Sequence, residues 1–205
     1  MRLRIKNIFA LLLTVAAVST SSIVAQTAQT PPASAKPLRY ELALDYSYLR
    51  SNAPPGGCDC FNLNGGSATF AWSLKPGGSL ALVGDITAAH AGSIASSGYD
   101  LTLSSYTAGA RYRLKLRQQP SLQPFGQVLV GVAHAGGGLV GGHSPAASNA
   151  GAAFAANVGG GVDLRINRLF SARLIEADYL VTTFDNSVND HQNNLRISAG
   201  VVLRF

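Results

Sequence analysis

Two cysteines one residue apart form the most unusual local feature of the chain, within Gly56-Gly57-Cys58-Asp59-Cys60-Phe61. Two thiolates could bind a soft metal ion only with further ligands, and no other Cys or His is close in sequence. The four histidines lie at or beyond predicted strand ends on one side of the protein: His90, His134, His143 and His191. A surface Cys/His metal site is therefore an alternative. We expect a local disulfide between Cys58 and Cys60 instead, because the chain begins like an exported protein, and we predict no metal and no cofactor.

A serine beside a histidine is the second candidate for chemistry. An acyl hydrolase needs a Ser/His pair that an acid holds in place, and His143-Ser144 is the only neighbouring pair of this kind. The pair falls in the Gly/Ala/Ser-rich segment 135–153, and a flexible backbone supports a preorganised site poorly. We therefore predict no catalytic residues, and we keep a lipid-modifying enzyme as an alternative.

Ionisable residues form the third candidate, because they recur on one side of apolar, alternating segments. The side chains that this pattern places together are Glu41, Asp45, Lys75, Asp85, Arg111, Arg113, Lys115, Asp163, Arg165, Glu176, Asp178, Arg196 and Arg204. Both signs are present and nearly balanced. Such a set can neutralise itself by pairing, whereas a set of one sign in a confined space could not.

The segments that carry these charges have the two-residue period of β-strands. In the last twelve residues, 194–205, every second side chain is apolar and ends in Val201, Leu203 and Phe205, while Arg196 and Arg204 lie on the opposite face. Similar alternation predicts strands over residues 39–50, 64–75, 79–90, 102–117, 124–134, 154–166, 169–183 and 194–205. The connections between them alternate between longer and shorter.

In two of these strands the pattern leaves the facing of some side chains open. In the seventh, Arg173 does not share the parity of Glu176 and Asp178; a β-bulge near Ile175 would bring all three charges to one side, and an alternative is that Arg173 extends to a membrane boundary. In the fifth, the facing is ambiguous, because Phe125 falls on the side of Gln127.

The N-terminal residues read as an export signal. Arg2, Arg4 and Lys6 precede an apolar run too short to span a bilayer, so we predict a cleaved signal peptide at 1–25, a flexible leader at 26–37 and one barrel domain at 38–205. Loss of the three signal cations lowers the net charge from +6 to +3. Nothing in this balance indicates a nucleic-acid partner.

Composition then favours a membrane over water on the apolar side. Only 13% of residues are charged and 22 are glycine, and no apolar run after residue 25 approaches the ~20 residues of a membrane helix. A bilayer-spanning form must therefore be a closed barrel, with apolar side chains toward lipid and the charges filling a narrow lumen. Aromatic residues near both strand ends would form interfacial girdles: Tyr40, Phe125, Phe170 and Phe205 at one end, Tyr48, Tyr106, Phe154 and Phe184 at the other.

The signal segment, the eight alternating strands and the ending Ser198-Ala199-Gly200-Val201-Val202-Leu203-Arg204-Phe205 resemble the small outer-membrane β-barrel superfamily, the OmpA/OmpX-like group. The resemblance implies an all-β, eight-stranded antiparallel up-and-down transmembrane barrel in a Gram-negative outer membrane. It also implies outer-membrane lipid and the barrel-assembly machinery as partners, with Val201, Leu203 and Phe205 in the assembly signal. We expect a monomeric, non-enzymatic barrel that is structural or presents surface loops. The alternatives are a small porin-like diffusion channel, and a soluble secreted ligand-binding barrel; the residues name no external ligand.

Overall fold

The computed structural model describes residues 38–51, 60–94, 99–136, 152–184 and 191–205. These form eight strands: β1 (Tyr40–Ser51), β2 (Phe61–Ser73), β3 (Leu80–Ile94), β4 (Tyr99–Arg113), β5 (Leu122–Gly136), β6 (Ala152–Arg165), β7 (Phe170–Thr182) and β8 (Gln192–Arg204). Within these ranges no helix is both long and apolar enough to cross a membrane, a result that does not bear on strands.

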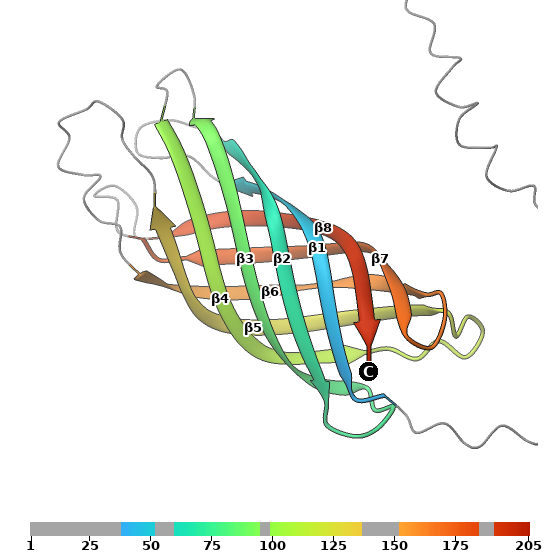
Figure 1. The fold of residues 1–205 in the computed structure, drawn as a ribbon. Helices are drawn as coiled ribbons and strands as arrows, with labels where there is room; N and C mark the ends of the chain where they lie inside the picture. The colour runs from blue at the N-terminus through green and yellow to red at the C-terminus, as the bar shows by residue number, and fades with distance from the viewer. Residues whose placement is uncertain (1–37, 52–59, 95–98, 137–151, 185–190) are drawn as a thin grey trace, which may run out of the picture. The chain divides into compact units, whose positions relative to one another are not determined.

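The strands close into one barrel. Each pairs antiparallel with the next in sequence, and β8 returns to β1 through pairs such as Leu42 with Leu203. In Figure 1 the near strands cross the far strands at a steep angle, which is the tilt that closure requires. The predicted eight-stranded, antiparallel, up-and-down barrel is confirmed.

We name the two ends of the barrel the turn end and the loop end. The turn end contains the start of β1, the last residues of β8 and the connections 74–79, 114–121 and 166–169; the loop end contains the connections 52–60, 95–98, 137–151 and 183–191. At the turn end, Gly77 has a φ of 65°, a conformation that favours glycine, and the Gly78 amide donates to the Lys75 carbonyl over 2.7 Å. Pro76-Gly77-Gly78 thus forms a tight turn between β2 and β3.

Some strand boundaries differ from the prediction. β3 and β4 continue to pair beyond His90, with Ala91 opposite Leu101 and Ile94 opposite Tyr99, so their connection is only 95–98. β4 ends at Arg113, four residues earlier than predicted, and its connection to β5 is the longer 114–121. The expected alternation of longer and shorter connections was therefore wrong for these two connections. Backbone pairing of β3 with β4 continues past the residues in which apolar and polar side chains alternate.

The barrel is apolar outside and polar inside, the reverse of a water-soluble sheet. Along β1, Leu44 and Tyr46 are 54% and 60% exposed, whereas Asp45 and Ser47 between them are buried. On β5, Val128 and its alternate neighbours point outward, which resolves the ambiguous strand. This is the arrangement of strands that face lipid.

The predicted bulge is present in β7. Asp163 lies opposite Arg173 but the preceding Val162 lies opposite Ile175, so one extra residue is inserted in β7. Leu174 and Ile175 are consequently both exposed, while Arg173 and Glu176 are both buried. The bulge thus turns Arg173, Glu176 and Asp178 to the same, inner side.

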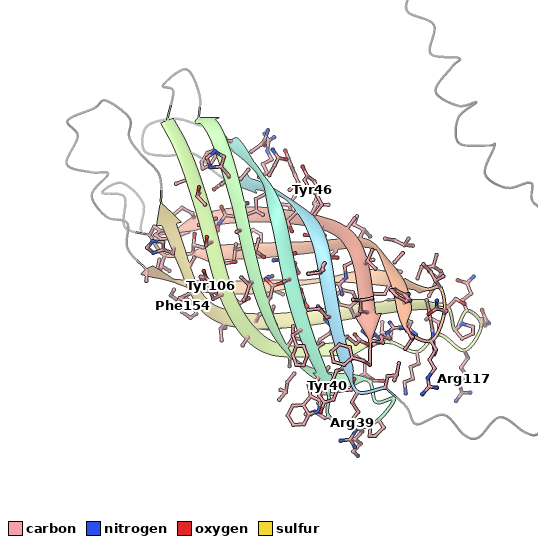
Figure 2. The ribbon with its side chains drawn as sticks, in the orientation of Figure 1. Arg39, Tyr40, Tyr46, Tyr106, Arg117 and Phe154 are labelled. Atoms are coloured by element: carbon pink, nitrogen blue, oxygen red, sulfur yellow. The ribbon has the colours of Figure 1, made fainter. Side chains whose placement is uncertain are left out.

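Aromatic rings gather outside the turn end, as expected. Tyr40 stacks on Phe70 and on Phe205, with centroids 6.0 and 5.8 Å apart. Figure 2 places Tyr40 beside Arg39 at this end, and Tyr106 and Phe154 in the other half of the barrel. Two predicted girdle residues were wrong: Phe125 is buried in the lumen, and Phe184 packs against the buried cluster at the loop end.

Candidate functional site

Arg196 on β8 is the centre of the buried charge network in the lumen. Its guanidinium contacts Asp85 on β3 at 2.8 Å, and Asp178 and Glu176 on β7 at 2.6 and 3.1 Å. Thr69 and Thr87 donate to the Asp85 carboxylate at 2.8 and 3.0 Å. Opposite walls of the barrel are therefore joined through one cation.

Arg173 on β7 forms a second centre nearer the turn end. It contacts Asp45 on β1 and Asp163 on β6, each at 3.0 Å, and Glu176 at 2.6 Å. Because Glu176 contacts both Arg173 and Arg196, the two centres form one continuous network.

A third group closes the network at the turn end. Arg113 donates to both carboxylate oxygens of Glu41 at 2.6 Å, the bidentate geometry that gives strong charge-assisted bonds. Arg204 contacts Glu41 at 3.1 Å and donates to Gln123 at 2.6 Å. Asp163 lies 3.7 Å from Arg113 and links this group to Arg173.

Phe125 and Gln127 on β5 complete the network, although neither was among the predicted lumen residues. Arg111 donates twice to the Gln127 side-chain oxygen, at 3.0 and 2.6 Å, and Gln127 donates onward to Glu176 at 2.9 Å. The Phe125 ring lies 4.2 Å from the Arg111 guanidinium and 4.9 Å from that of Arg173. A ring can hold two buried cations in this way. The sequence did contain a sign of this placement, because Phe125 lies two residues before the polar Gln127 and therefore on the same face of the strand.

Inward-facing glycines make room for these long side chains. A Cβ added at Gly161 would lie 2.9 Å from the Phe125 ring, one at Gly159 would overlap the Asp178 carboxylate, and one at Gly200 would overlap that of Asp45. An eight-stranded lumen is only just wide enough for side chains. The missing Cβ atoms are therefore part of the network's geometry.

Three residues expected in the lumen lie outside it. Lys75, Lys115 and Arg165 are exposed at the turn end, where Lys115 donates to the Gly77 carbonyl and Arg165 to the Asn167 carbonyl. Lys75 and Lys115 come after the last residues of β2 and β4, so strand parity no longer decides their direction. The described network contains six acids and five arginines: Glu41, Asp45, Asp85, Asp163, Glu176, Asp178, Arg111, Arg113, Arg173, Arg196 and Arg204.

The loop end of the lumen contains an apolar cluster that was not among the predicted features, beside the buried polar side chains Ser51 and Asn194. One buried cluster there takes residues from seven strands: Leu49, Leu63, Ala89, Ala91, Leu103, Ala133, Ala155 and Leu180. We call it the apolar plug. Between it and the charges lies a small polar layer in which Ser47 contacts Ser67 and Ser198 at 3.0 and 2.8 Å. The larger apolar cluster thus lies toward the loops, and the ion pairs lie toward the turns.

Solved structures of other proteins share this architecture. No protein-family profile and no curated protein sequence matches the chain. Among solved structures, Neisserial surface protein A matches with a TM-score of 0.60 at 16% identity, over 81% of this chain and 97% of that one. Ail, the attachment invasion locus protein of Yersinia pestis, matches with a TM-score of 0.56 at 15% identity, over 82% and 99%. The outer membrane protein OprG of Pseudomonas aeruginosa matches with a TM-score of 0.52 at 11% identity, over 83% and 97%.

This chain has the fold of the small outer-membrane β-barrels. The predicted resemblance to the OmpA/OmpX-like group is confirmed at the level of fold. At these identities the likeness concerns the barrel alone and does not assign an activity.

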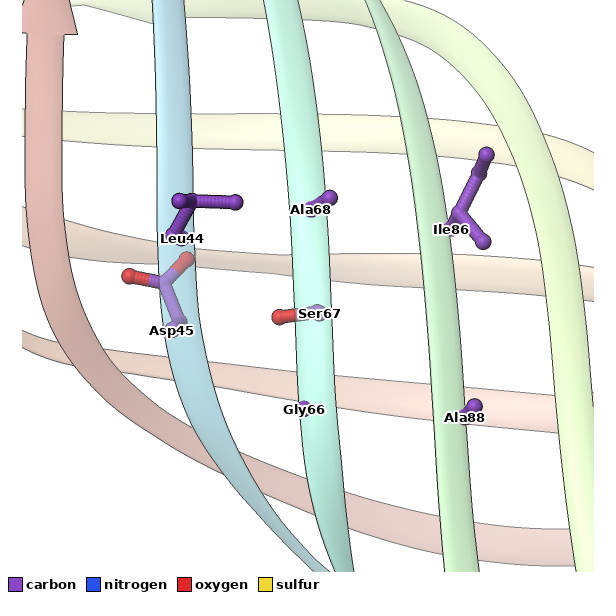
Figure 3. Close-up of a pocket in the computed structure, with 7 residues that line it drawn as sticks. All are labelled: Leu44, Asp45, Gly66, Ser67, Ala68, Ile86 and Ala88. Carbon is purple, nitrogen blue, oxygen red and sulfur yellow. The ribbon is translucent and has the colours of Figure 1, made fainter.

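A shallow groove of about 520 Å³ crosses β1, β2 and β3 of this outer-membrane barrel fold. Leu44 and Ile86 flank a floor of small residues, Gly66, Ala68 and Ala88, as Figure 3 shows. Asp45 and Ser67 also line it, but Asp45 is bound to Arg173 and Ser67 to Ser47. The groove is therefore an apolar surface on the lipid-facing side of the fold, with its polar groups already engaged.

The remaining predicted sites fall largely outside the described residues. Cys58, His143 and Ser144 are not among them, and Cys60 is exposed just before β2. Within the described ranges no three His, Cys, Asp or Glu side chains are placed to hold a metal ion. The residues predicted to form an assembly signal, Val201, Leu203 and Phe205, belong to the outward parity of β8, with Val201 and Phe205 50% and 55% exposed.

Proposed function

We propose that this protein spans the outer membrane of a Gram-negative bacterium as a closed, non-enzymatic barrel that presents its loop-end connections outside the cell. The apolar outer wall would face acyl chains, and the turn end would face the periplasm together with both ends of the strand set. Residues 1–25 would direct export and be removed, residues 26–37 would form a periplasmic leader, and Val201, Leu203 and Phe205 would be read by the barrel-assembly machinery.

The filled lumen is the observation that carries the proposal. All six carboxylates of the network contact an arginine, so their charges hold the wall together and are not available as general acids or bases. Arg196 and Arg173 reach across the axis from β8 and β7 to β3 and β1. Together with the apolar plug, they favour a rigid scaffold over an open pore.

The apolar plug bears on the alternative of a diffusion channel. A hydrated ion would have to pass eight apolar side chains and then displace arginines from their carboxylates. Removing a partner from a buried ion pair typically costs about 3–5 kcal/mol, so steady conduction is not expected without rearrangement of the lumen.

Membrane fractionation, planar-bilayer recording and lipid A analysis test the proposal. Detergent-extracted membranes from a producing strain should show heat-modifiable migration on a gel, with the protein in the outer-membrane fraction; recovery in the soluble extract would contradict it and favour a secreted barrel. In planar bilayers the purified protein should give no stable conductance. Large, steady openings would replace the scaffold with the channel, and an altered lipid A acyl pattern in producing cells would favour an enzyme.

A further inference from the structure

Among the described residues, most of the exposed charged side chains lie at the turn end. Six cations are exposed there, and we call them the cationic rim: Arg39, Lys75, Lys115, Arg117, Arg165 and Arg168. Arg39 precedes β1, and Arg165 is the last residue of β6. The other four lie in the three turn-end connections. Figure 2 shows Arg39 and Arg117 at this same end of the barrel.

No acidic side chain is exposed among the described turn-end residues. Of the chain's ten Asp and Glu, six are buried in the lumen network. The other four fall by sequence in or beside the connections of the loop end: Asp59, Asp100, Asp185 and Asp190. The described turn end therefore carries an excess of exposed positive charge, and a field of this kind attracts an anionic partner.

Exposed apolar residues accompany every cation of the rim. Leu74 precedes Lys75, and Leu114 and Leu116 enclose Lys115, with exposures of 42%, 50% and 41%. The others are flanked in the same way by Tyr40, Ile166 and Leu169, also exposed. A surface that only met water or a soluble acidic protein would not need this pairing. Alternating apolar and cationic side chains suit a membrane interface, where the first enter the acyl region and the second reach the headgroups.

We infer that the cationic rim binds the phosphate headgroups of anionic phospholipids in the leaflet at the turn end. The inference rests on the proposed function, because it requires the barrel to span a bilayer. Arg39 and Lys75 form the best-defined part: the Ser73 amide donates to the Arg39 carbonyl at 2.8 Å, and Lys75 follows two residues later. Trp72 belongs to the same part of the wall, because it pairs with Tyr40, the neighbour of Arg39, and precedes Lys75 by three residues.

The fluorescence of Trp72 reports which lipids contact this part of the wall. Trp72 is the only tryptophan in the chain and is 41% exposed on the outer wall. The protein is folded into vesicles that contain either brominated phosphatidylglycerol or brominated phosphatidylcholine at the same mole fraction. Bromine on a lipid that contacts the indole quenches its fluorescence. We expect the relative binding constant for phosphatidylglycerol to exceed that for phosphatidylcholine by at least about threefold, and the ratio to fall as salt is added.

Substitutions distinguish lipid preference caused by the cationic rim from preference caused by general contact of the barrel with lipid. Arg39→Gln combined with Lys75→Gln should bring the ratio close to one, whereas Arg50→Gln, which removes an exposed arginine at the loop end, should leave it unchanged. A ratio near one in the wild type, or one that survives the double substitution, overturns the inference. Equal quenching would leave a soluble acidic partner as the occupant of the rim.

The same vesicles distinguish failure of the inference from failure of the proposed function. Folded barrels migrate differently before and after boiling. If no such shift appears in any lipid, the transmembrane proposal fails and the lipid site fails with it. If the shift appears but Trp72 does not discriminate between the lipids, the barrel stands and only the headgroup site is lost.

Discussion

Arg196 on β8 donates a hydrogen bond of 2.8 Å to Asp85 on β3. The strands β8 and β3 are not neighbours in the barrel wall. The two residues are 111 positions apart in sequence. Their contact crosses the lumen and fixes the distance between opposite walls. It also defines the part of the molecule in which substitutions should have their largest effects.

Replacing Arg196 should strongly destabilise the barrel. Arg196→Met would leave Asp85, Glu176 and Asp178 buried without their shared cation, and we expect the free energy of unfolding to fall by about 3–5 kcal/mol. Urea titration of the refolded protein in lipid measures this. The control is Arg165→Met, because Arg165 is exposed and should cost less than about 1 kcal/mol. Equal losses for the two variants would contradict the placement of Arg165 outside the network.

The aromatic ring of Phe125 should stabilise the barrel by more than an aliphatic side chain that fills the same space. Phe125→Leu keeps an apolar side chain but removes the ring faces that contact Arg111 and Arg173, and we expect a loss of about 0.5–2 kcal/mol. Phe125→Ala also opens a cavity, and we expect about 3–5 kcal/mol. The same titration measures both. An unchanged Leu variant would mean that the ring acts only as a filler.

The glycines of β6 should tolerate no side chain. Gly161→Ala would press a methyl group against Phe125 and the Ile175 carbonyl, and we expect a loss of about 1–3 kcal/mol. Gly84→Ala is the matched control, because no atom lies within 4 Å of the added Cβ. We expect it to be neutral or to stabilise by up to about 1 kcal/mol. A larger loss at Gly84 than at Gly161 would reverse this account.

Cys58 and Cys60 should be joined in the exported protein. We expect a maleimide probe to label the folded barrel only after a reductant is added, because an oxidising compartment favours the disulfide. A Cys58→Ser variant should expose the Cys60 thiol, which lies at the surface, and should be labelled without reductant. Labelling of the untreated wild type would mean that both thiols are free and would reopen the metal-site alternative.

Most of the barrel wall could be predicted from alternation. In β1, the order Leu44, Asp45, Tyr46, Ser47 is enough to separate an outer from an inner face, because successive Cβ atoms in a strand point to opposite sides. The break in alternation at Arg173 even located a bulge. The same rule failed at Lys75 and Lys115, where the strand has ended and parity carries no direction.

The contents of the lumen could be predicted only in part. The sequence shows that Glu41 and Arg113 face inward, but they come from β1 and β4 and meet only because the barrel is closed and narrow. The apolar plug escaped notice for a similar reason. Leu49, Leu63 and Leu180 are single apolar residues on inner faces, and they become a layer only when seven strands bring them to one level.

By itself, the sequence determined the strands, their number and which side chains face lipid, since these depend on neighbours one or two residues apart. The tertiary structure decided which charges meet, where the ionic part of the lumen ends and which cations form the rim. Those relationships depend on strand register and closure, which join residues more than a hundred positions apart, such as Asp45 and Arg173. No local pattern along the chain encodes the width of the space into which such side chains must fit.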